Sequence, residues 1–345
     1  MNEHELHERL SRPTPAAVDA LRRCPGDVIV LGAGGKMGPS LATMLRRAAD
    51  EVATRDGPPG ARRRRVLAVS RWSSAAAAAH LEAEGVEVVA ADLADRDAVD
   101  HLPDAPNVIF MAGQKFGTQG APSATWAMNV VVPAYCADRY RDSRIVAFST
   151  GNVYPLLPAA GGGARETDAP APVGEYAASC LGRERVFEHW SNTRGTRVAI
   201  VRLNYAVDLR YGVLVDVALK VWRGEPVDVT NGYVNVIWQG DANALAIACL
   251  PHAATPPFVV NVTGPELLRV RDVARELGRL LGRAPTIVGD EAPDALLSRT
   301  DRMRDTLGPA SVPAATLLEW VAEWVRAGNP LLGKPTKFER RDGKF

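Results

Sequence analysis

The chain contains little cysteine, few aromatic residues and almost no net charge. Among its 345 residues are 4 cysteines and 6% aromatic residues. The cysteines lie far apart, with no C-x-x-C pair and no histidine at metal-ligand spacing, so we expect neither a disulfide framework nor a metal site. This usage favours a reducing, cytoplasmic setting. The cysteines are Cys24, Cys136, Cys180 and Cys249.

An excess of either charge and long hydrophobic runs are also absent. The 41 basic residues are balanced by 40 acidic ones, which gives no support to a nucleic acid or a membrane surface as partner. No apolar run approaches the roughly 18 residues that a membrane span needs, and Met1–Leu6 is too polar to begin a signal peptide. We therefore expect a soluble protein whose partner is a small molecule.

Glycine is plentiful, and one cluster of it lies between two apolar runs. Val28–Leu31 leads into Gly32, Gly34, Gly35 and Gly38, and Leu41–Leu45 follows. The pattern predicts a buried strand, a tight turn and a helix whose N-terminus can hold a phosphate. The spacing is G-x-x-G-x-x-G, because Met37 occupies the last glycine place of G-x-G-x-x-G. Taken alone, the stretch is also compatible with a plain structural turn.

Short apolar runs alternate with helical spans over the first 205 residues. This alternation is typical of a parallel sheet with helices on both faces, so we predict an α/β fold with a Rossmann-type doubly wound sheet. The two longest helices are expected at residues 126–140 and 176–190. Strands are predicted at residues 28–31, 66–70, 86–90, 107–112, 144–149 and 197–202.

The order of these landmarks resembles the extended short-chain dehydrogenase/reductase family, which comprises NAD(P)-dependent sugar epimerases, dehydratases and related reductases. The resemblance spans roughly residues 27–327. It rests on the glycine spacing, on Asp92-Leu93 after the third strand, and on the segments 148–155 and 174–180. Tyr176-Ala-Ala-Ser179 matches the first four places of the family's Y-x-x-S-K motif. The resemblance implies an enzyme that binds a nicotinamide dinucleotide.

The resemblance also implies an organisation of the chain. It suggests a homodimer packed through the helices at 126–140 and 177–190, although the apolar faces of these helices can equally pack within one chain. The expected parts are an N-terminal helical lead-in (1–24), an NAD(P)-binding Rossmann domain (25–205), a smaller C-terminal α/β substrate-binding lobe interleaved with it (206–330), and a basic tail on the surface (331–345).

The cofactor is expected to be NADP or NAD. Ser70-Arg71 ends the second strand where NAD-preferring members carry an acid, and an arginine can pair with the 2′-phosphate of NADP. We therefore favour NADP, while the alternative is that Arg71 is simply exposed. The residues expected at the cofactor are Gly32, Gly34, Gly35, Lys36, Met37, Gly38, Ser70, Arg71, Asp92, Leu93, Met111, Ala112, Gly113, Lys115 and Asn129.

Thr150 and Tyr176 fall on the family's catalytic positions. A phenol with a pKa near 10 is a poor base at neutral pH, but a nearby cation lowers that pKa and lets the phenol exchange a proton with a substrate hydroxyl. The threonine hydroxyl then holds the substrate carbonyl or alcohol. Tyr176 in isolation would be interpreted as an interior tyrosine, whereas its order after Thr150 favours a site residue.

The lysine expected four residues after the tyrosine is replaced by Cys180. A thiol can neither supply positive charge nor hold the nicotinamide ribose as a lysine does. Three alternatives follow: Arg183 or Lys115 substitutes as the cation, Tyr176 works unassisted, or the protein binds a dinucleotide without catalysing hydride transfer. Cys180 itself is better interpreted as a small buried helix residue than as a nucleophile.

The substrate is expected to be a small sugar, sugar acid or polyol. Gly151-Asn152 replaces the acidic pair of dehydratases, and Val234 replaces an arginine with which nucleotide-sugar enzymes clamp the diphosphate. We therefore predict an NAD(P)-dependent oxidoreductase or epimerase. The alternatives are a non-catalytic dinucleotide-binding sensor or scaffold, and a nucleotide-sugar epimerase. The residues expected to face the substrate are Gln114, Asn152, Asn204 and Trp238.

Overall fold

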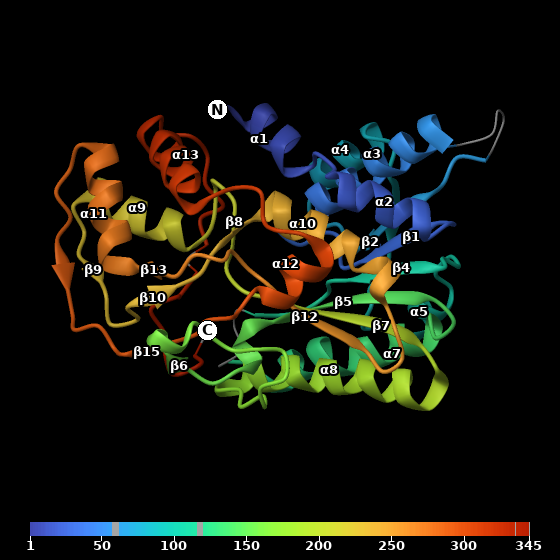
Figure 1. Ribbon diagram of the computed structural model, residues 1–345. Coiled ribbons are helices and arrows are strands. Elements are labelled where there is room, and N and C mark those ends of the chain that lie inside the picture. Colours follow the sequence, from blue (N-terminus) through green and yellow to red (C-terminus); the bar gives the residue numbers. More distant parts are fainter. Residues whose placement is uncertain (57–61, 116–119, 335, 345) are drawn as a thin grey trace.

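A seven-stranded parallel sheet forms the centre of the computed structural model, which describes residues 1–56, 62–115, 120–334 and 336–344 (Figure 1). The strand order is β12-β7-β5-β4-β1-β2-β3, and every pairing in it is parallel. This confirms the predicted Rossmann-type doubly wound fold. The strands are β1 (Val28–Leu31), β2 (Val66–Ser70), β3 (Glu87–Ala90), β4 (Asn107–Phe110), β5 (Arg144–Thr150), β7 (Arg197–Leu203) and β12 (Phe258–Val262).

Helices cover both faces of this sheet because its inner strands are apolar on both sides. In Figure 1 one group of helices lies above the sheet and a second group lies below it. No helix in the described part of the chain is long and apolar enough to cross a bilayer. The first group is α2 (Pro15–Arg23), α3 (Gly38–Asp56), α10 (Gln239–Ala248) and α12 (Asp301–Leu307); the second is α5 (Arg96–Asp100), α7 (Val132–Arg139) and α8 (Gly174–Arg194); α4 (Ala75–Ala83) packs beside β3.

The strand order reverses between β1 and β4, so the loops after these strands diverge and leave a crevice. Gly32 begins the first of these loops with a φ of +91°, in the region that favours glycine. A Cβ at this position would lie 2.5 Å from the backbone nitrogen of Ala112. Only glycine therefore lets the turn after β1 approach the chain that leaves β4.

The helix predicted at 126–140 is composed of three segments. They are α6 (Pro122–Trp126), the π-helical segment η1 (Ala127–Val131) and α7. A π-helical turn contains one residue more than an α-helical turn and often occurs at functional sites. Here it includes Asn129, whose side chain is fully buried. The apolar spacing of the sequence did not reveal this turn.

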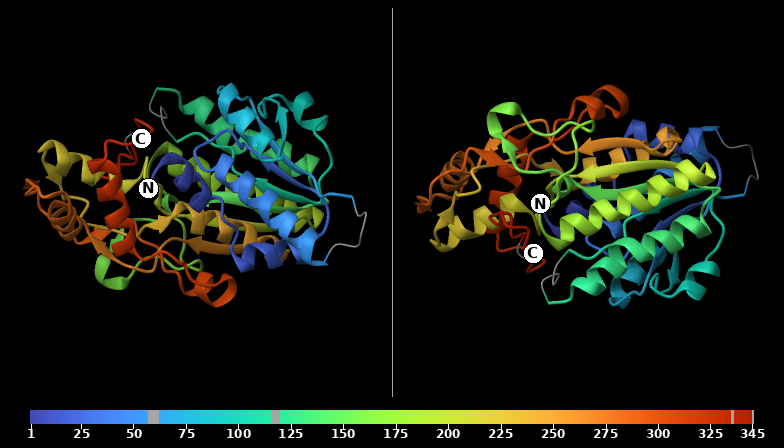
Figure 2. Two further views of the ribbon diagram at one scale, coloured as in Figure 1. Left: turned by 90° about the horizontal axis from the view of Figure 1, so that it is seen from above. Right: turned by 90° about the horizontal axis from the view of Figure 1, so that it is seen from below.

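A smaller lobe of helices and short strands stands beside the sheet (Figure 2). Its apolar core includes residues from α9, α11 and α13, so the three helices pack together. The lobe's helices are α9 (Val213–Arg223), α11 (Val270–Leu281) and α13 (Ala314–Arg326). The short strands of the chain are β6 (Leu157–Pro158), β8 (Ala206–Val207), β9 (Val227–Asp228), β10 (Tyr233–Val234), β11 (Ile237–Trp238), β13 (Leu268–Arg269), β14 (Ile287–Val288) and β15 (Asp294–Ala295), and the 3₁₀ turns are η2 (Gly151–Val153), η3 (Ala159–Gly161) and η4 (Leu250–His252).

The N-terminal residues connect the two lobes. Helix α1 (Glu3–Leu10) begins at Asn2, whose side chain accepts from the Glu5 backbone while the Glu5 side chain accepts from Asn2. Leu6 and Leu10 of α1 lie in the core of the smaller lobe. Helix α2 instead packs against α3 and α10 on the sheet. All views place both termini near the junction of the lobes (Figures 1 and 2).

The C-terminal segment lies partly on the surface, as expected, but two of its described residues, Thr336 and Phe338, are buried and anchor it. Phe338 is only 1% exposed and belongs to the core of the smaller lobe. Thr336 donates to the Asp216 carboxylate from its backbone nitrogen at 2.8 Å and from its hydroxyl at 2.5 Å. Burial of an aromatic ring and two hydrogen bonds hold the segment in place. Residues 335 and 345 of the predicted tail lie outside the described residues.

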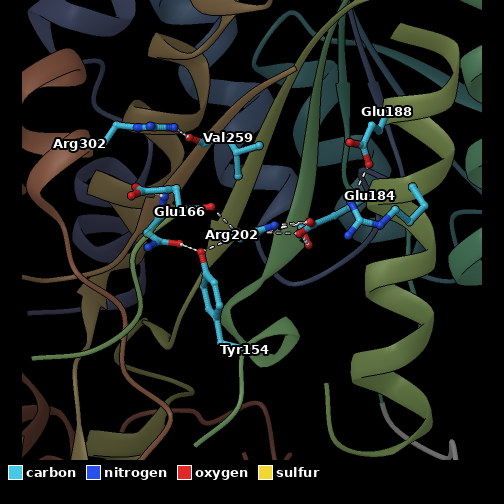
Figure 3. Close-up of polar contacts among 10 residues, drawn as sticks. Tyr154, Glu166, Glu184, Glu188, Arg202, Val259 and Arg302 are labelled. Carbon is cyan, nitrogen blue, oxygen red and sulfur yellow. Dashed lines mark hydrogen bonds and ion pairs between the residues drawn. The ribbon is translucent and has the colours of Figure 1, made fainter. Parts of the chain in front are cut away.

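A buried polar network connects α8 to the sheet (Figure 3). Arg202 of β7 and Glu184 of α8 are 6% and 2% exposed and form an ion pair of 2.7 Å. Ser149 of β5 donates to Glu184 at 2.5 Å, and Arg202 donates to the Tyr154 hydroxyl at 2.7 Å. Tyr154 in turn donates to Asn261 of β12 at 2.9 Å. The network fixes α8 relative to three neighbouring strands.

Arg202→Met is expected to lower the free energy of unfolding by about 3–5 kcal/mol, because it leaves the buried Glu184 charge without its partner. Denaturant midpoints measured by circular dichroism would test this value. Combining it with Glu184→Leu is expected to recover most of the loss, since no charge then remains buried.

Arg185→Met provides the matched control. Arg185 pairs with Glu188 on the same helix, but it is largely exposed, so its removal is expected to change stability by less than about 1 kcal/mol. Equal effects of the two single substitutions would contradict the importance that we assign to the buried pair.

Candidate functional site

A cavity of about 1020 Å³ opens at the crevice between β1 and β4, and many of the predicted site residues line it. They arrive from four places: the turn after β1, the loop after β4, the end of β5 with the start of α8, and the loop after β7. The predicted residues that line the cavity are Gly32, Gly34, Gly35, Lys36, Met37, Met111, Gly113, Lys115, Thr150, Asn152, Tyr176 and Asn204.

The glycine turn has the features of a phosphate cradle. Gly35 borders the cavity, and a Cβ there would meet no neighbouring atom closer than 3.6 Å, so the side chain would project into open space. Helix α3 starts directly after this turn and has no acidic residue in its first turn. Its free N–H groups and partial positive charge suit an anion. The turn therefore fits the pyrophosphate of a dinucleotide.

Lys36 extends from the glycine turn toward the smaller lobe. Its Nζ donates to the carbonyl of Ala206 at 3.1 Å and lies 4.2 Å from the centre of the Tyr211 ring. Burial lowers the pKa of Lys36 to about 8. An anion in the cavity would stabilise the protonated amine, so this side chain can contact a phosphate or a carboxylate.

The residues expected at the adenosine end lie beside the cavity but do not line it. Arg71 at the end of β2 is 70% exposed, and its guanidinium lies 3.8 Å from the Asp92 carboxylate, which follows β3. A Cβ on Gly34 would overlap the Ser70 hydroxyl, which places Ser70 against the glycine turn. The Leu93 side chain is buried in the core on the α5 and α7 face of the sheet.

Asn129 organises the loop that follows β4. Its Oδ1 accepts from the backbone nitrogen of Gln114 at 2.9 Å, and its Nδ2 donates to the Gln114 carbonyl at 3.0 Å. Arg183 also donates to Asn129 Oδ1 at 2.8 Å, and to the Phe148 carbonyl at 2.9 Å. Asn129 and Arg183 thus lie buried beneath the cavity wall. They position the loop that carries Lys115.

Thr150 and Tyr176 both line the cavity, Thr150 at the end of β5 and Tyr176 in the first turn of α8. Burial raises the pKa of the Tyr176 phenol, the neighbouring Cys180 thiol raises it further, and the charge of Arg183 acts in the opposite direction. Burial likewise raises the pKa of Cys180, so this residue is a neutral thiol. The phenol is accordingly protonated at neutral pH.

Of the two cations considered for the missing lysine, Lys115 alone lines the cavity together with Tyr176. Its Nζ lies 5.8 Å from the centre of the Tyr176 ring, and burial lowers the pKa of Lys115 to about 8. Arg183 influences Tyr176 through its charge from below the wall. Its contacts with Phe148 and Asn129 hold its guanidinium there.

Two expectations about the substrate side do not match the structure. Trp238 is 3% exposed, packs edge-on against Trp320 at 5.5 Å and belongs to the core of the smaller lobe, so it does not face the cavity. Gln114 is held through its backbone and does not line the cavity either. Asn204 does line it, although its amide also donates to Asn235 at 3.0 Å.

Sequence reasoning missed several residues of the cavity wall. They come from α1, from the loops around β8 and from the C-terminal segment. No motif marks the first two groups, and the basic composition of the tail was the one signal for the third. The missed residues include His7, Tyr205, Arg210, Tyr211, Leu332, Lys334 and Thr336.

The comparison with protein families decides the identification. The profile of the NAD-dependent epimerase/dehydratase family matches residues 28–207, which is more than half of the chain. The chain belongs to this family. Its members are NAD-dependent enzymes, which agrees with the phosphate cradle and confirms the resemblance seen in the sequence. No curated protein matches the chain.

Solved structures share the fold over most of their length. MoeE5, in complex with UDP-glucose and NAD, is 21% identical, with 88% of this chain and 99% of that chain covered and a TM-score of 0.69. UDP-glucose 4-epimerase from Thermotoga maritima is 16% identical, with 88% and 99% covered and a TM-score of 0.68. DesIV, a dTDP-glucose 4,6-dehydratase from Streptomyces venezuelae, is 20% identical, with 87% and 97% covered and a TM-score of 0.70. The TM-scores establish a common fold, and identities this low establish no more than that.

The pKa of Lys36 predicts a pH-dependent stability. A lysine in the unfolded chain titrates near 10.5, whereas Lys36 in the folded protein titrates near 8, so the unfolded state binds more protons between these values. The destabilisation from the buried charge is complete below pH 8 and disappears as the pH rises to 10.5. Lys36→Met removes it. As the pH rises from 7 to 10.5, the free energy of unfolding of the variant should therefore fall by about 1–3 kcal/mol relative to that of wild type, because only wild type gains stability over this range.

Denaturant unfolding of both proteins across this range would measure the difference. Lys344→Met is the control, because Lys344 is exposed and should give parallel pH profiles. If the stabilities of wild type and Lys36→Met changed in parallel with pH, the lowered pKa of Lys36 would be contradicted.

Proposed function

We propose that the protein is an NAD(P)-dependent oxidoreductase or epimerase that acts on a small sugar, sugar acid or polyol, with Tyr176 as its acid/base. The observation that carries the proposal is that Thr150 and Tyr176 line the same cavity as the glycine turn. Structures of similar fold contain NAD together with UDP-glucose or UDP-glucuronic acid, which supports a carbohydrate-like substrate.

The bound nicotinamide would supply the hydride acceptor or donor. Thr150 donates a hydrogen bond to the substrate oxygen, and Tyr176 exchanges the proton of the same oxygen. Because burial keeps the phenol protonated, Tyr176 needs a positive charge nearby before it can act as a base. Lys115 supplies that charge from within the cavity, and Arg183 adds to it from beneath. In the structure the threonine hydroxyl donates to Asn152 Oδ1 and accepts from the Asn152 backbone nitrogen, both at 3.2 Å, so its proton would turn from Asn152 to the substrate oxygen on binding.

Tyr176→Phe is expected to reduce turnover by about 10²–10⁴-fold, because it removes the group that moves the proton. The dinucleotide affinity should be unchanged. The substrate would first be found by screening sugars, sugar acids and polyols for cofactor reduction, and turnover would then be followed by absorbance of the reduced nicotinamide. Tyr135→Phe, on α7 and outside the cavity, should leave turnover unchanged.

A second candidate function is binding of the dinucleotide without chemistry. The neutral Cys180 in the lysine position and the raised pKa of Tyr176 favour it. Equal turnover of wild type and Tyr176→Phe would refute the tyrosine mechanism. Tight dinucleotide binding without turnover in the screen would favour the sensor or scaffold. A nucleotide-sugar epimerase is less well supported, since Val234 is fully buried and offers no charge to a diphosphate.

We further propose that the cofactor is NADP rather than NAD. Arg71 stands exposed at the end of β2, next to the glycine turn, where its guanidinium can reach the 2′-phosphate. Asp92 lies 3.8 Å from it and would orient the guanidinium.

Arg71→Ala should weaken NADPH binding by about tenfold and leave NADH binding unchanged, because only NADPH carries the extra phosphate. Titration by nicotinamide fluorescence measures both affinities. Arg55→Ala, an exposed arginine on α3, is the matched control. Tighter binding of NADH than of NADPH by wild type would overturn the preference.

A homodimer is also part of the proposal. Trp126 and Val131 are exposed, large and apolar, and they lie on the helical stretch that was expected to form the interface. The four cysteines are buried and free, which agrees with a cytoplasmic protein.

A further inference from the structure

The cavity is positively charged on the side of Tyr176. Lys36, Lys115, Arg210 and Lys334 line it together with the tyrosine. Among the described residues, the carboxylates that line the cavity come from α1 and α4 instead, and they are Glu3, Glu8 and Glu84. Two of these, Glu8 and Glu84, are paired with Arg47. An anionic ligand would therefore be stabilised beside Tyr176.

Two carboxylates behind the wall, Asp208 and Asp216, partly offset the charges of Lys36 and Lys115. Asp208 is fully buried and pairs with Arg210 at 2.8 Å. Asp216 accepts both hydrogen bonds from Thr336. Lys36 has a backbone carbonyl and an aromatic ring as its contacts. Neither carboxylate lines the cavity, so a ligand there meets the lysines rather than these acids.

The C-terminal segment brings Lys334 to this place. Leu332 donates its backbone N–H to the Arg210 carbonyl at 3.0 Å, and Thr336 is bound to Asp216. Farther along, Gly343 lies against Gly174, two residues before Tyr176. The segment therefore runs past the cavity from the smaller lobe to the start of α8.

Lys337 adds a second cation from the same segment. Its φ of +55° lies in the left-handed region that residues other than glycine rarely adopt. The neighbouring residues hold it there, because Thr336 is bound to Asp216 and Phe338 is buried. The charge of Lys337 is close enough to lower the pKa of Lys115. Lys337 therefore contributes positive charge near Lys115, although it does not line the cavity itself.

We propose that Lys334, together with Lys36 and Lys115, forms a subsite for the anionic group of the substrate. This inference rests on the proposed function and narrows its substrate to a sugar that carries a phosphate or a carboxylate. The glycine turn and the N-terminus of α3 already provide a cradle for the cofactor's pyrophosphate. Lys334 of the C-terminal segment is therefore assigned to the substrate rather than to the cofactor.

Calorimetric titration of the full-length protein, saturated with the dinucleotide that it binds more tightly, would test the subsite. The probes are inorganic phosphate, glucose 6-phosphate, gluconate, UDP-glucose and glucose. We expect saturable millimolar or tighter binding of at least one anion and at least tenfold weaker binding of glucose. Lys334→Met should weaken anion binding by about tenfold and leave dinucleotide binding unchanged.

Lys344→Met is the matched control, since Lys344 lies in the same segment but is exposed and pairs with Asp342. The preferred probe distinguishes a phosphate monoester, a carboxylate and a diphosphate as the source of the anion. Equal binding of glucose and the anions, no anion binding, or loss of dinucleotide affinity in Lys334→Met would each overturn the subsite. Failure of wild type to bind either dinucleotide would instead refute the proposed function.

Discussion

The buried ion pair between Glu184 and Arg202 is the interaction on which the geometry of the site depends. Glu184 belongs to α8, the helix that carries Tyr176, and Arg202 belongs to β7 in the sheet. Ser149 attaches the same carboxylate to β5, one residue before Thr150. Two charges that are both removed from water require a fixed mutual geometry. The pair therefore determines how the tyrosine and the threonine face each other.

Burial has opposite effects on the two kinds of titratable group in the cavity. It raises the pKa values of Tyr176 and Cys180, and it lowers those of Lys36 and Lys115 to about 8. Both effects disfavour the charged forms when water is excluded. A cofactor and a substrate that bring phosphates would favour the protonated lysines. A positive charge near Tyr176 would favour its phenolate. The protonation states of the buried lysines and of Tyr176 therefore depend on the charges of the ligands in the cavity.

The chain termini contribute more to the site than their position in the sequence indicates. Helix α1 inserts Leu6 and Leu10 into the smaller lobe and brings His7 to the cavity, where it contacts Arg210 at 2.9 Å. The C-terminal segment supplies Lys334 and Thr336. Both segments cross the junction between the lobes. They therefore stabilise the relative position of the glycine turn and the substrate side.

The sequence by itself determined the fold and picked out many of the residues that line the cavity. Apolar strands, the glycine turn and the spacing of Thr150 and Tyr176 are local patterns, and local patterns are visible in a sequence. The tertiary structure decided which cation shares the cavity with the tyrosine, that Trp238 lies in the core, and that the C-terminal segment borders the cavity. It also revealed the π-helical turn at Asn129. These features arise from contacts between residues far apart in the chain, and such contacts leave no periodic pattern.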